Sequence, residues 1–363
     1  MHGWPESWFS WRHQLTFFGQ QGYRVFAPDM RGYGRTDSPP RSSDFTVYHH
    51  ASDMIALLQH YGLTKCILIG HDWGAILCWQ LAHLFPEYFV ACANLSVPYR
   101  LRTPSTPNPF HTLIKTFGEY NDPQQYFFYI VYHNEMNNAS SYDHGPAEAE
   151  YDANPHELIY NMWSDDRVKT DDSTISNKVG VLRRDGGMLA NLRSKKGRPA
   201  EYPAWCSEAD MDYVVEQFKV SGFRGGVNYY RNFGTNHQLT PQLINRKLHC
   251  PAFFLTGEDD LVRKMRFAVV SSDPFASGSS QTKSSQSDND DFQKRGLETV
   301  CSDLRSFTIL KRDKNLTAGH WIQQERPKEV NNALLSFFRD VEDVFHSAVG
   351  GPLMRGGGTN SKM

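Results

Sequence analysis

The pentapeptide Gly-His-Asp-Trp-Gly at residues 70–74 carries the side chain whose chemistry is most readily defined in this chain. Apolar runs at 66–69 and 75–79 flank it, and this pattern predicts a strand, a sharp turn and a helix. A glycine at each end suits a turn that is too tight for a Cβ atom. The turn would lift Asp72 clear of the sheet edge, where its carboxylate can attack a carbon atom and form an ester. We therefore predict covalent catalysis through Asp72.

An ester on Asp72 has to be cleaved by water, and the attacking water needs a base. His320 is our candidate, because it lies between a last predicted strand at 306–310 and a closing helix predicted at 327–345. The chain contains 15 histidines, so the position of this one, rather than its residue type, supports the prediction.

A histidine base needs a carboxylate that holds its tautomer. Asp260 directly follows the glycine turn after a predicted strand at 251–255 and is our candidate for this acid. Glu258 and Asp259 stand beside it, and either of them could take the role instead.

The tetrahedral intermediate of ester hydrolysis needs two backbone N–H donors. We expect one to be the N–H of Trp73, the residue after the nucleophile. The other should come from a loop near an early strand, where the tetrapeptide His-Gly-Trp-Pro stands at residues 2–5. The N–H of Trp4 is our candidate for this second donor.

Alternating strands and helices indicate the fold that must position these side chains. Most of the predicted strands are continuous apolar runs, as in a parallel sheet that is covered by helices on both faces. Apolar residues at helical spacing predict a helix at 48–61. The predicted strands lie at 23–28, 66–69, 89–97, 251–255 and 306–310.

The composition changes along the chain and predicts a core with an inserted second unit. We expect an α/β core at 1–99 and 241–345 and an aromatic-rich, partly helical cap at 100–240 between its strands. Within the core, the Ser/Asp-rich stretch 271–291 is predicted to be disordered. The Gly-rich residues 346–363 are predicted to form a flexible tail.

Bulk composition excludes several classes of partner. The 363 residues have a net charge of -2 and a pI of about 6.7, which gives no indication of nucleic-acid or anionic-membrane binding. No apolar run approaches the roughly 18 residues of a membrane span. Six scattered cysteines indicate a reduced, cytoplasmic protein. The C-terminal Ser361-Lys362-Met363 is close to the Ser-Lys-Leu peroxisomal address, and no feature indicates an oligomeric state.

Four motifs together resemble the soluble epoxide hydrolases of the α/β-hydrolase superfamily. They lie at 2–8, 29–34, 70–74 and 319–321. The spacing Gly-x-Asp-x-Gly matches the nucleophile elbow of that superfamily, with Asp in place of Ser, and the chain order of nucleophile, acid and histidine also matches. The resemblance implies an α/β-hydrolase fold, with a mostly parallel sheet, helices on both faces and an inserted helical cap.

In this family two cap tyrosines donate hydrogen bonds to the epoxide oxygen. The resemblance places one at Tyr230 and the other at Tyr129, for which Tyr126 and Tyr132 are rivals. A phenol, with a pKa near 10, can protonate the alkoxide that ring opening creates. A halide leaving group needs no proton, so the two tyrosines distinguish this family from the haloalkane dehalogenases, in which three of the four motifs also occur.

Two features depart from the family pattern. The family places one or more strands before the motif that begins here at residue 2, so we expect a sheet that lacks those N-terminal strands. Asp260 and His320 are also further apart than the family pattern predicts, because the Ser/Asp-rich stretch lies between them.

The sequence therefore predicts an epoxide hydrolase that converts a small lipophilic epoxide into a vicinal diol. Asp72 would attack the epoxide, Tyr129 and Tyr230 would protonate its oxygen, and His320 with Asp260 would activate water. This chemistry needs no metal and no organic cofactor. Two alternatives stay open: a haloalkane dehalogenase with the same nucleophile, and an inactive, truncated homologue that only binds a ligand.

Overall fold

The computed structural model describes most of the chain, including every predicted site residue. The described residues are 1–108, 126–136, 144–164, 180–184, 186–193, 202–264, 286–314 and 316–349. The expected targeting tripeptide Ser361-Lys362-Met363 lies outside them, as do residues 271–285 of the predicted disordered stretch.

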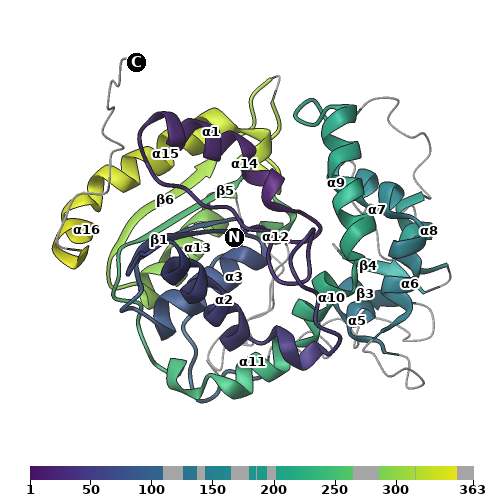
Figure 1. Cartoon of the computed structure of the whole chain (residues 1–363), viewed down its shortest axis with the longest axis horizontal. Coiled ribbons are helices and arrows are strands. Elements are labelled where there is room, and N and C mark those ends of the chain that lie inside the picture. Colours follow the sequence, from purple (N-terminus) through teal and green to yellow (C-terminus); the bar gives the residue numbers. More distant parts are fainter. Residues whose placement is uncertain are drawn as a thin grey trace.

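Four parallel strands form the main sheet, in the spatial order β1-β2-β5-β6 (Figure 1). They are β1 (Cys66–His71), β2 (Phe89–Leu95), β5 (Ala252–Gly257) and β6 (Leu304–Leu310). The apolar runs of the sequence predicted all four. Because the strands run in one direction, their carboxyl ends share one edge of the sheet, and the loops that follow them meet there.

Helices cover both faces of this sheet (Figure 1). The helices of the core are α1 (Arg12–Gln20), α2 (Val47–His60), α3 (Trp73–Leu84), α12 (Leu261–Lys264), α13 (Gln286–Val300), α14 (Ile322–Glu325), α15 (Pro327–Asp340) and α16 (Glu342–Val349), with the 3-10 turns η1 (Trp8–Trp11), η2 (Ser42–Phe45) and η3 (Pro241–Leu243). Helix α2 confirms the helix predicted at 48–61 to within one residue at each end.

Alternate residues of the central strands point to opposite faces and build two cores. Ala93 of β2 and Leu255 of β5 pack with Leu334 and other apolar residues of α1 and α15. Their chain neighbours Cys92 and Phe254 belong to the opposite core, together with apolar residues of α2 and α3. A parallel sheet that is buried on both faces, as the continuous apolar strands predicted, is thus confirmed.

The described helices of the predicted cap gather on one side of the sheet, except the last of them, which runs back along the core (Figure 1). These are α5 (Tyr129–Asn134), α6 (Pro146–Ala153), α7 (Pro155–Trp163), α8 (Gly187–Arg193), α9 (Glu208–Ser221), α10 (Arg224–Arg231) and α11 (Phe233–Leu239). They also hold a small antiparallel sheet of β3 (Tyr126–Phe128) and β4 (Val181–Arg183), which the sequence did not predict. Strands of three residues are too short to show a periodic pattern.

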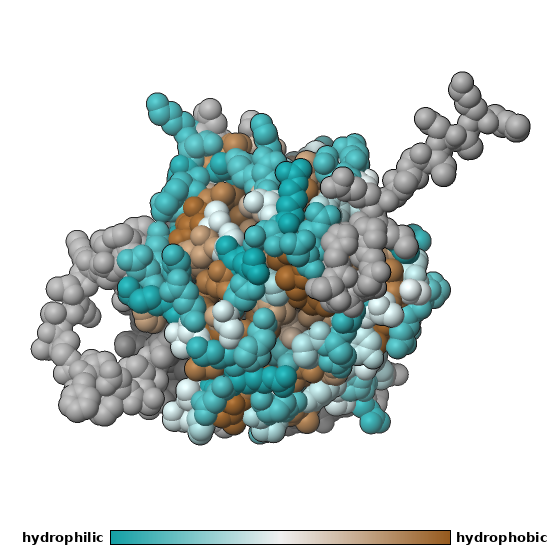
Figure 2. Space-filling view, turned by 90° about the vertical axis from the view of Figure 1, so that its left-hand side faces the viewer, coloured by the Kyte–Doolittle hydropathy of each residue, from teal (hydrophilic) through white to brown (hydrophobic). Residues whose placement is uncertain are grey.

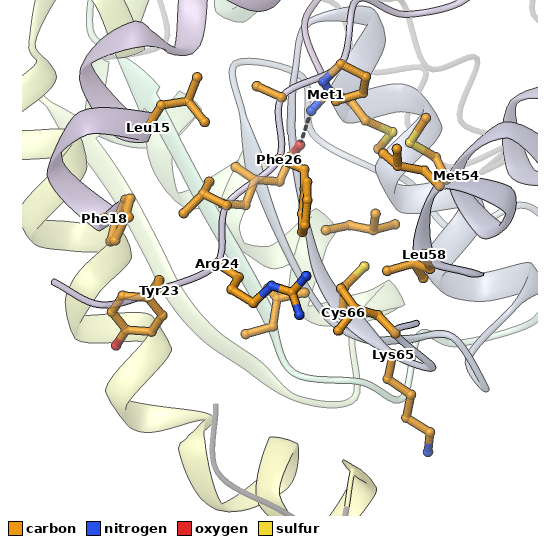
Figure 3. Close-up of a pocket in the computed structure, with 18 of the residues that line it drawn as sticks. Met1, Leu15, Phe18, Tyr23, Arg24, Phe26, Met54, Leu58, Lys65 and Cys66 are labelled. Carbon is orange, nitrogen blue, oxygen red and sulfur yellow. Dashed lines mark hydrogen bonds between the residues drawn. The ribbon is translucent and has the colours of Figure 1, made fainter. Parts of the chain in front are cut away.

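The prediction of a strand at 23–28 was wrong, because the structure has no strand there. An apolar cavity of about 460 Å³ lies between this segment and β1, lined also by α1 and α2 (Figure 3). Of the described residues, only Met1 forms hydrogen bonds with this edge of β1. Its ammonium donates to the Ile69 carbonyl (2.6 Å), and the His71 N–H donates to the Met1 carbonyl (3.1 Å). Among the described residues, segment 23–28 therefore pairs with no strand.

Two predicted irregular stretches are helical where the structure describes them. Residues 286–291, expected to be disordered, form the beginning of α13, and residues 346–349 of the expected tail belong to α16. Helix α13 is anchored because Leu297 and Val300 are fully buried in the core. The beginning of this helix was not predicted because its first turns are rich in Ser and Asp and show no hydrophobic pattern.

No helix in the described part of the chain combines the length and the apolar character needed to cross a bilayer. Figure 2 looks onto the side of the molecule at the left of Figure 1 and shows hydrophobic residues that reach the surface between hydrophilic ones.

Candidate active site

Asp72 occupies the turn between β1 and α3 with a φ of 51° and a ψ of -118°. Residues other than glycine seldom adopt a positive φ, and such strain is concentrated at functional sites. Gly70 and Gly74 make the turn possible. A Cβ on Gly70 would lie 2.2 Å from the Gly74 carbonyl oxygen, and one on Gly74 would lie 2.2 Å from the Met1 carbonyl oxygen. The predicted steric need for both glycines is confirmed.

His320 lies between the carboxylates of Asp72 and Asp260, on the loop that joins β6 to α14. Its Nε2 atom is 3.6 Å from Oδ2 of Asp72, and its Nδ1 atom is 3.0 Å from Oδ1 of Asp260. The structure thus brings together the three side chains that the sequence predicted as nucleophile, base and acid.

The geometry also separates Asp260 from its two rivals. Asp260 is fully buried, whereas Asp259 pairs with Arg312 (2.8 Å) and Glu258 accepts a hydrogen bond from the Arg312 backbone N–H (3.0 Å). Of these three carboxylates, only Asp260 contacts His320. The loop from 258 to 260 therefore turns one carboxylate inward and the other two outward.

The charges of the two carboxylates control the protonation of His320. Burial of the imidazole ring disfavours its charged form, but Asp260 and Asp72 outweigh burial and raise the pKa of His320 to about 10. Burial likewise favours the neutral form of Asp260, but His320 and other hydrogen-bond donors lower the pKa of Asp260 overall. At neutral pH the site therefore holds an imidazolium between two carboxylates.

The backbone N–H of Trp4 donates a hydrogen bond to Oδ1 of Asp72 (2.9 Å). The loop that carries it comes close because Gly3 has no side chain, since a Cβ there would lie 2.4 Å from the Asp72 Cβ. Trp73, the other predicted donor, is the first residue of α3, where backbone N–H groups have no acceptor within the helix. The Trp4 N–H therefore contacts the Asp72 carboxylate, and the Trp73 N–H directly follows Asp72 at the start of α3.

Two cap tyrosines lie close to each other beside Asp72. The ring centroids of Tyr129 and Tyr230 are 5.9 Å apart, and the Asp72 charge acts on both phenols. Of the two rivals for Tyr129, Tyr132 donates its hydroxyl proton to Glu150 (2.9 Å) instead. The other rival, Tyr126, pairs through its backbone with β4.

Burial keeps both phenols protonated. It raises the pKa of Tyr230 well above 10, and Tyr129 and Asp72 raise this pKa further. Burial and then Asp72 also raise the pKa of Tyr129, although a hydrogen bond with Tyr230 partly opposes the shift. Both phenols are therefore neutral at neutral pH and lie close enough to Asp72 for its charge to act on them.

A buried polar network that the sequence analysis missed ties the loops of the site together. The Glu6 carboxylate accepts hydrogen bonds from the Gly3 N–H (2.9 Å) and from the Gln323 amide (2.8 Å), and it bonds with Nδ1 of His71 (2.8 Å). Nε2 of His71 bonds with the carbonyl oxygen of His320 (2.8 Å). Glu6 and His71 lie within two of the sequence motifs, which could have marked them as candidates. Their contacts were not predicted because their partners are distant in sequence.

Aromatic rings enclose the site on the cap side. The Tyr230 ring packs edge-on against Trp73 (centroids 4.9 Å apart) and against Trp4 (5.8 Å), and Phe233 packs against Trp73 (4.6 Å).

In the described residues, no group of three or more His, Cys, Asp or Glu side chains is arranged to hold a metal ion.

Comparison with known proteins agrees with this geometry. Residues 1–179 match the family model described as the alpha/beta hydrolase fold. Epoxide hydrolase A of Mycobacterium tuberculosis is 31% identical over 351 residues, which cover 94% of this chain and 89% of the relative. Epoxide hydrolase 2 of Siraitia grosvenorii is 30% identical, with 93% and 90% of the two chains covered.

The solved structures lead to the same family. The crystal structure of Epoxide Hydrolase A from Mycobacterium thermoresistibile superimposes with a TM-score of 0.72 at 32% identity, and the match covers 93% of this chain and 89% of that one. Fold and site together define an α/β-hydrolase. Within that class, the chain belongs to the epoxide hydrolase family.

Proposed function

We propose that this protein hydrolyses an epoxide to a vicinal diol through a covalent ester on Asp72. The observation that carries the proposal is the pair of neutral phenols, Tyr129 and Tyr230, beside a carboxylate that also faces a histidine. An alkoxide is a poor leaving group unless it is protonated, and phenols held in their neutral form supply that proton.

In the first step an Asp72 oxygen attacks one oxirane carbon and the carbon–oxygen bond to the epoxide oxygen breaks. The oxygen takes a proton from Tyr230, with Tyr129 as its second hydrogen-bond donor. The product is a hydroxyalkyl ester of Asp72. Forming the ester removes one of the two carboxylate charges that raise the pKa of His320, so the imidazolium then gives its proton through water to the Tyr230 phenolate and His320 becomes a neutral base.

In the second step water attacks the ester carbonyl carbon of Asp72 and gives a proton to Nε2 of His320. The N–H groups of Trp4 and Trp73 stabilise the oxyanion of the tetrahedral intermediate, and Asp260 stabilises the imidazolium. Collapse of the intermediate expels the alkoxide, which takes the remaining proton of the attacking water and leaves as the diol, and the Asp72 carboxylate is regenerated beside the imidazolium of the resting state.

The core at 1–99 and 241–345 supplies the nucleophile, base and acid in this proposal, and the cap at 100–240 supplies the tyrosines. The rings of Trp4, Trp73 and Phe233 around Tyr230 favour a lipophilic epoxide. No step requires a metal or organic cofactor.

Diol formation tests the proposal. The purified chain should convert styrene oxide to its diol, and Asp72→Asn should abolish the reaction. Release of halide from 1-chlorohexane without diol formation from any epoxide would favour a dehalogenase, and inactivity on both would favour a homologue that only binds ligand.

We also propose that Ser361-Lys362-Met363 directs the protein to peroxisomes, because the tripeptide resembles a known targeting signal. A fluorescent protein that carries the last twelve residues should collect in peroxisomes, and the same fusion without the final tripeptide should stay diffuse. Diffuse signal from both fusions would leave the protein in the cytoplasm.

A further inference from the structure

Ser96 stands directly after β2, at the same edge of the sheet as Asp72 and Asp260. It is fully buried, and its φ of 72° is unusual for a residue with a side chain. Its backbone N–H donates to the carbonyl oxygen of Leu255 in β5 (2.9 Å), which fixes the turn between the two central strands. Backbone strain of this kind persists where the surroundings hold it, often at functional sites.

The strained turn points the Ser96 hydroxyl at the histidine of the site. Its Oγ atom lies 2.9 Å from Nδ1 of His320, and the same nitrogen lies 3.0 Å from Oδ1 of Asp260. A hydrogen bond from Ser96 also lowers the pKa of Asp260. Ser96, Asp260 and His320 therefore form a closed triangle of polar contacts.

The protons of this triangle have one consistent arrangement when His320 acts as a base. Nε2 must be free to accept a proton from water, so Nδ1 carries the N–H and shares it between Asp260 and the Ser96 oxygen. The hydroxyl proton of Ser96 then points to the Asp260 carboxylate, which has lone pairs to accept it. Each donor has an acceptor, and the imidazole ring is fixed at two points instead of one.

We propose that Ser96 is a positioning residue for the base: its hydroxyl holds the His320 ring so that Nε2 faces the water that cleaves the Asp72 ester. This inference rests on the proposed function, because it requires the ester. It places the effect of Ser96 on ester hydrolysis alone, since ring opening uses the Asp72 carboxylate and the tyrosines and needs no base.

The test measures the two half-reactions separately, by rapid quench of a single turnover with styrene oxide and mass spectrometry of the intact protein. Ser96→Ala should form the ester at the wild-type rate within about twofold and cleave it about 3- to 10-fold more slowly, the scale of one lost hydrogen bond. The covalent adduct should accumulate accordingly. Ser96→Thr, which keeps the hydroxyl, should restore most of the hydrolysis rate.

Two controls separate positioning from a general effect on folding. Ser96→Gly removes the hydroxyl but relieves the positive φ, so it should fold well and still hydrolyse the ester slowly. Ser10→Ala removes another buried serine hydroxyl, which donates to the Ser7 carbonyl (3.0 Å), and should leave both steps unchanged.

The outcomes distinguish this inference from the proposal on which it rests. Unchanged ester hydrolysis in Ser96→Ala, or equal slowing of both half-reactions, would overturn the positioning role while the covalent mechanism stands. Absence of any adduct, in the wild-type protein and in variants that turn over slowly, would overturn the covalent mechanism and the role of Ser96 with it.

Discussion

Nε2 of His320 lies 3.6 Å from Oδ2 of Asp72, beyond the length of a hydrogen bond but close enough for each charge to act on the other. The histidine therefore stands beside the carboxylate without occupying its attacking lone pair. In the proposed mechanism this relationship suits His320 to the second half-reaction, in which the carboxylate has become an ester.

Replacement of His320 should separate the two half-reactions. His320→Asn should still form the ester, because attack on the epoxide needs Asp72 and the tyrosines only. The ester should then accumulate to nearly one equivalent, visible as a mass increase of the intact protein equal to the mass of the epoxide. Asp72→Asn is the matched control and should gain no mass, and normal turnover by His320→Asn would remove this residue from the site.

Loss of the phenol protons should slow ring opening. Tyr230→Phe should lower the rate of ester formation by about 100-fold, the usual scale for loss of a general acid. Tyr129→Phe should lower the rate of ester formation less, and the double variant should lower it most. Tyr132→Phe is the control, because its hydroxyl donates to Glu150, and it should stay near the wild-type rate. Full epoxide activity in the double variant would contradict the role of the tyrosines.

The buried N-terminus should make stability depend on pH. Burial lowers the pKa of the Met1 ammonium from 8.0 to about 6. Between these values the unfolded chain holds more of this proton than the folded chain, so the free energy of unfolding should rise from pH 6 to pH 8, by up to about 2 kcal/mol. Urea denaturation at a series of pH values measures this change.

The N-acetylated chain is the control for Met1, because it cannot bind the proton. His320 acts with the opposite sign in both chains: its pKa is raised to about 10, so its contribution is full below an unfolded pKa of about 6.5 and falls as the pH rises toward 10. This contribution cancels in the difference between the chains. A difference that does not change between pH 6 and pH 8 would contradict the prediction.

The cavity beside β1 predicts that an added strand would stabilise the fold. Met1 bonds with Ile69 and His71 as a residue does in a parallel ladder, so residues placed ahead of it would continue along β1 into the cavity (Figure 3). An extension of about five alternating Val and Leu residues should raise Tm by about 3 °C or more, which corresponds to roughly 1 kcal/mol. A Gly-Ser extension of equal length is the control, and equal Tm values would show that the cavity does not accept a strand.

The sequence predicted the parts of the fold that a local pattern determines. The strands β1, β2, β5 and β6 and the elbow at Asp72 follow from apolar runs and glycine spacing, and the structure contains each of them. The prediction of a strand at 23–28 was wrong because a strand forms only where its backbone bonds to a second strand. Among the described residues, the edge of β1 beside this segment bonds with Met1 alone. Apolar character predicts burial but does not supply that partner.

The site was predictable where residue type and motif agree, and not where tertiary contact alone gives a residue its role. Asp72 stands out because it follows a strand and lies between Gly70 and Gly74, and His320 because it lies between the last strand and the closing helix. Ser96 lies in no recognisable motif, and it contacts His320, which is 224 positions away in the sequence. Glu6 and His71 form a hydrogen bond although they are 65 positions apart. Contacts of that range become visible only when the strands are assembled.

The central claim is that water attacks the ester on Asp72 and not the epoxide. A single turnover in water enriched in heavy oxygen, with enzyme in excess over styrene oxide, tests it most directly. The account predicts that the label appears in the peptide that contains Asp72 and that the first diol released carries none. Label in the first diol, with none in Asp72, would show that water attacks the epoxide directly and would contradict the covalent mechanism.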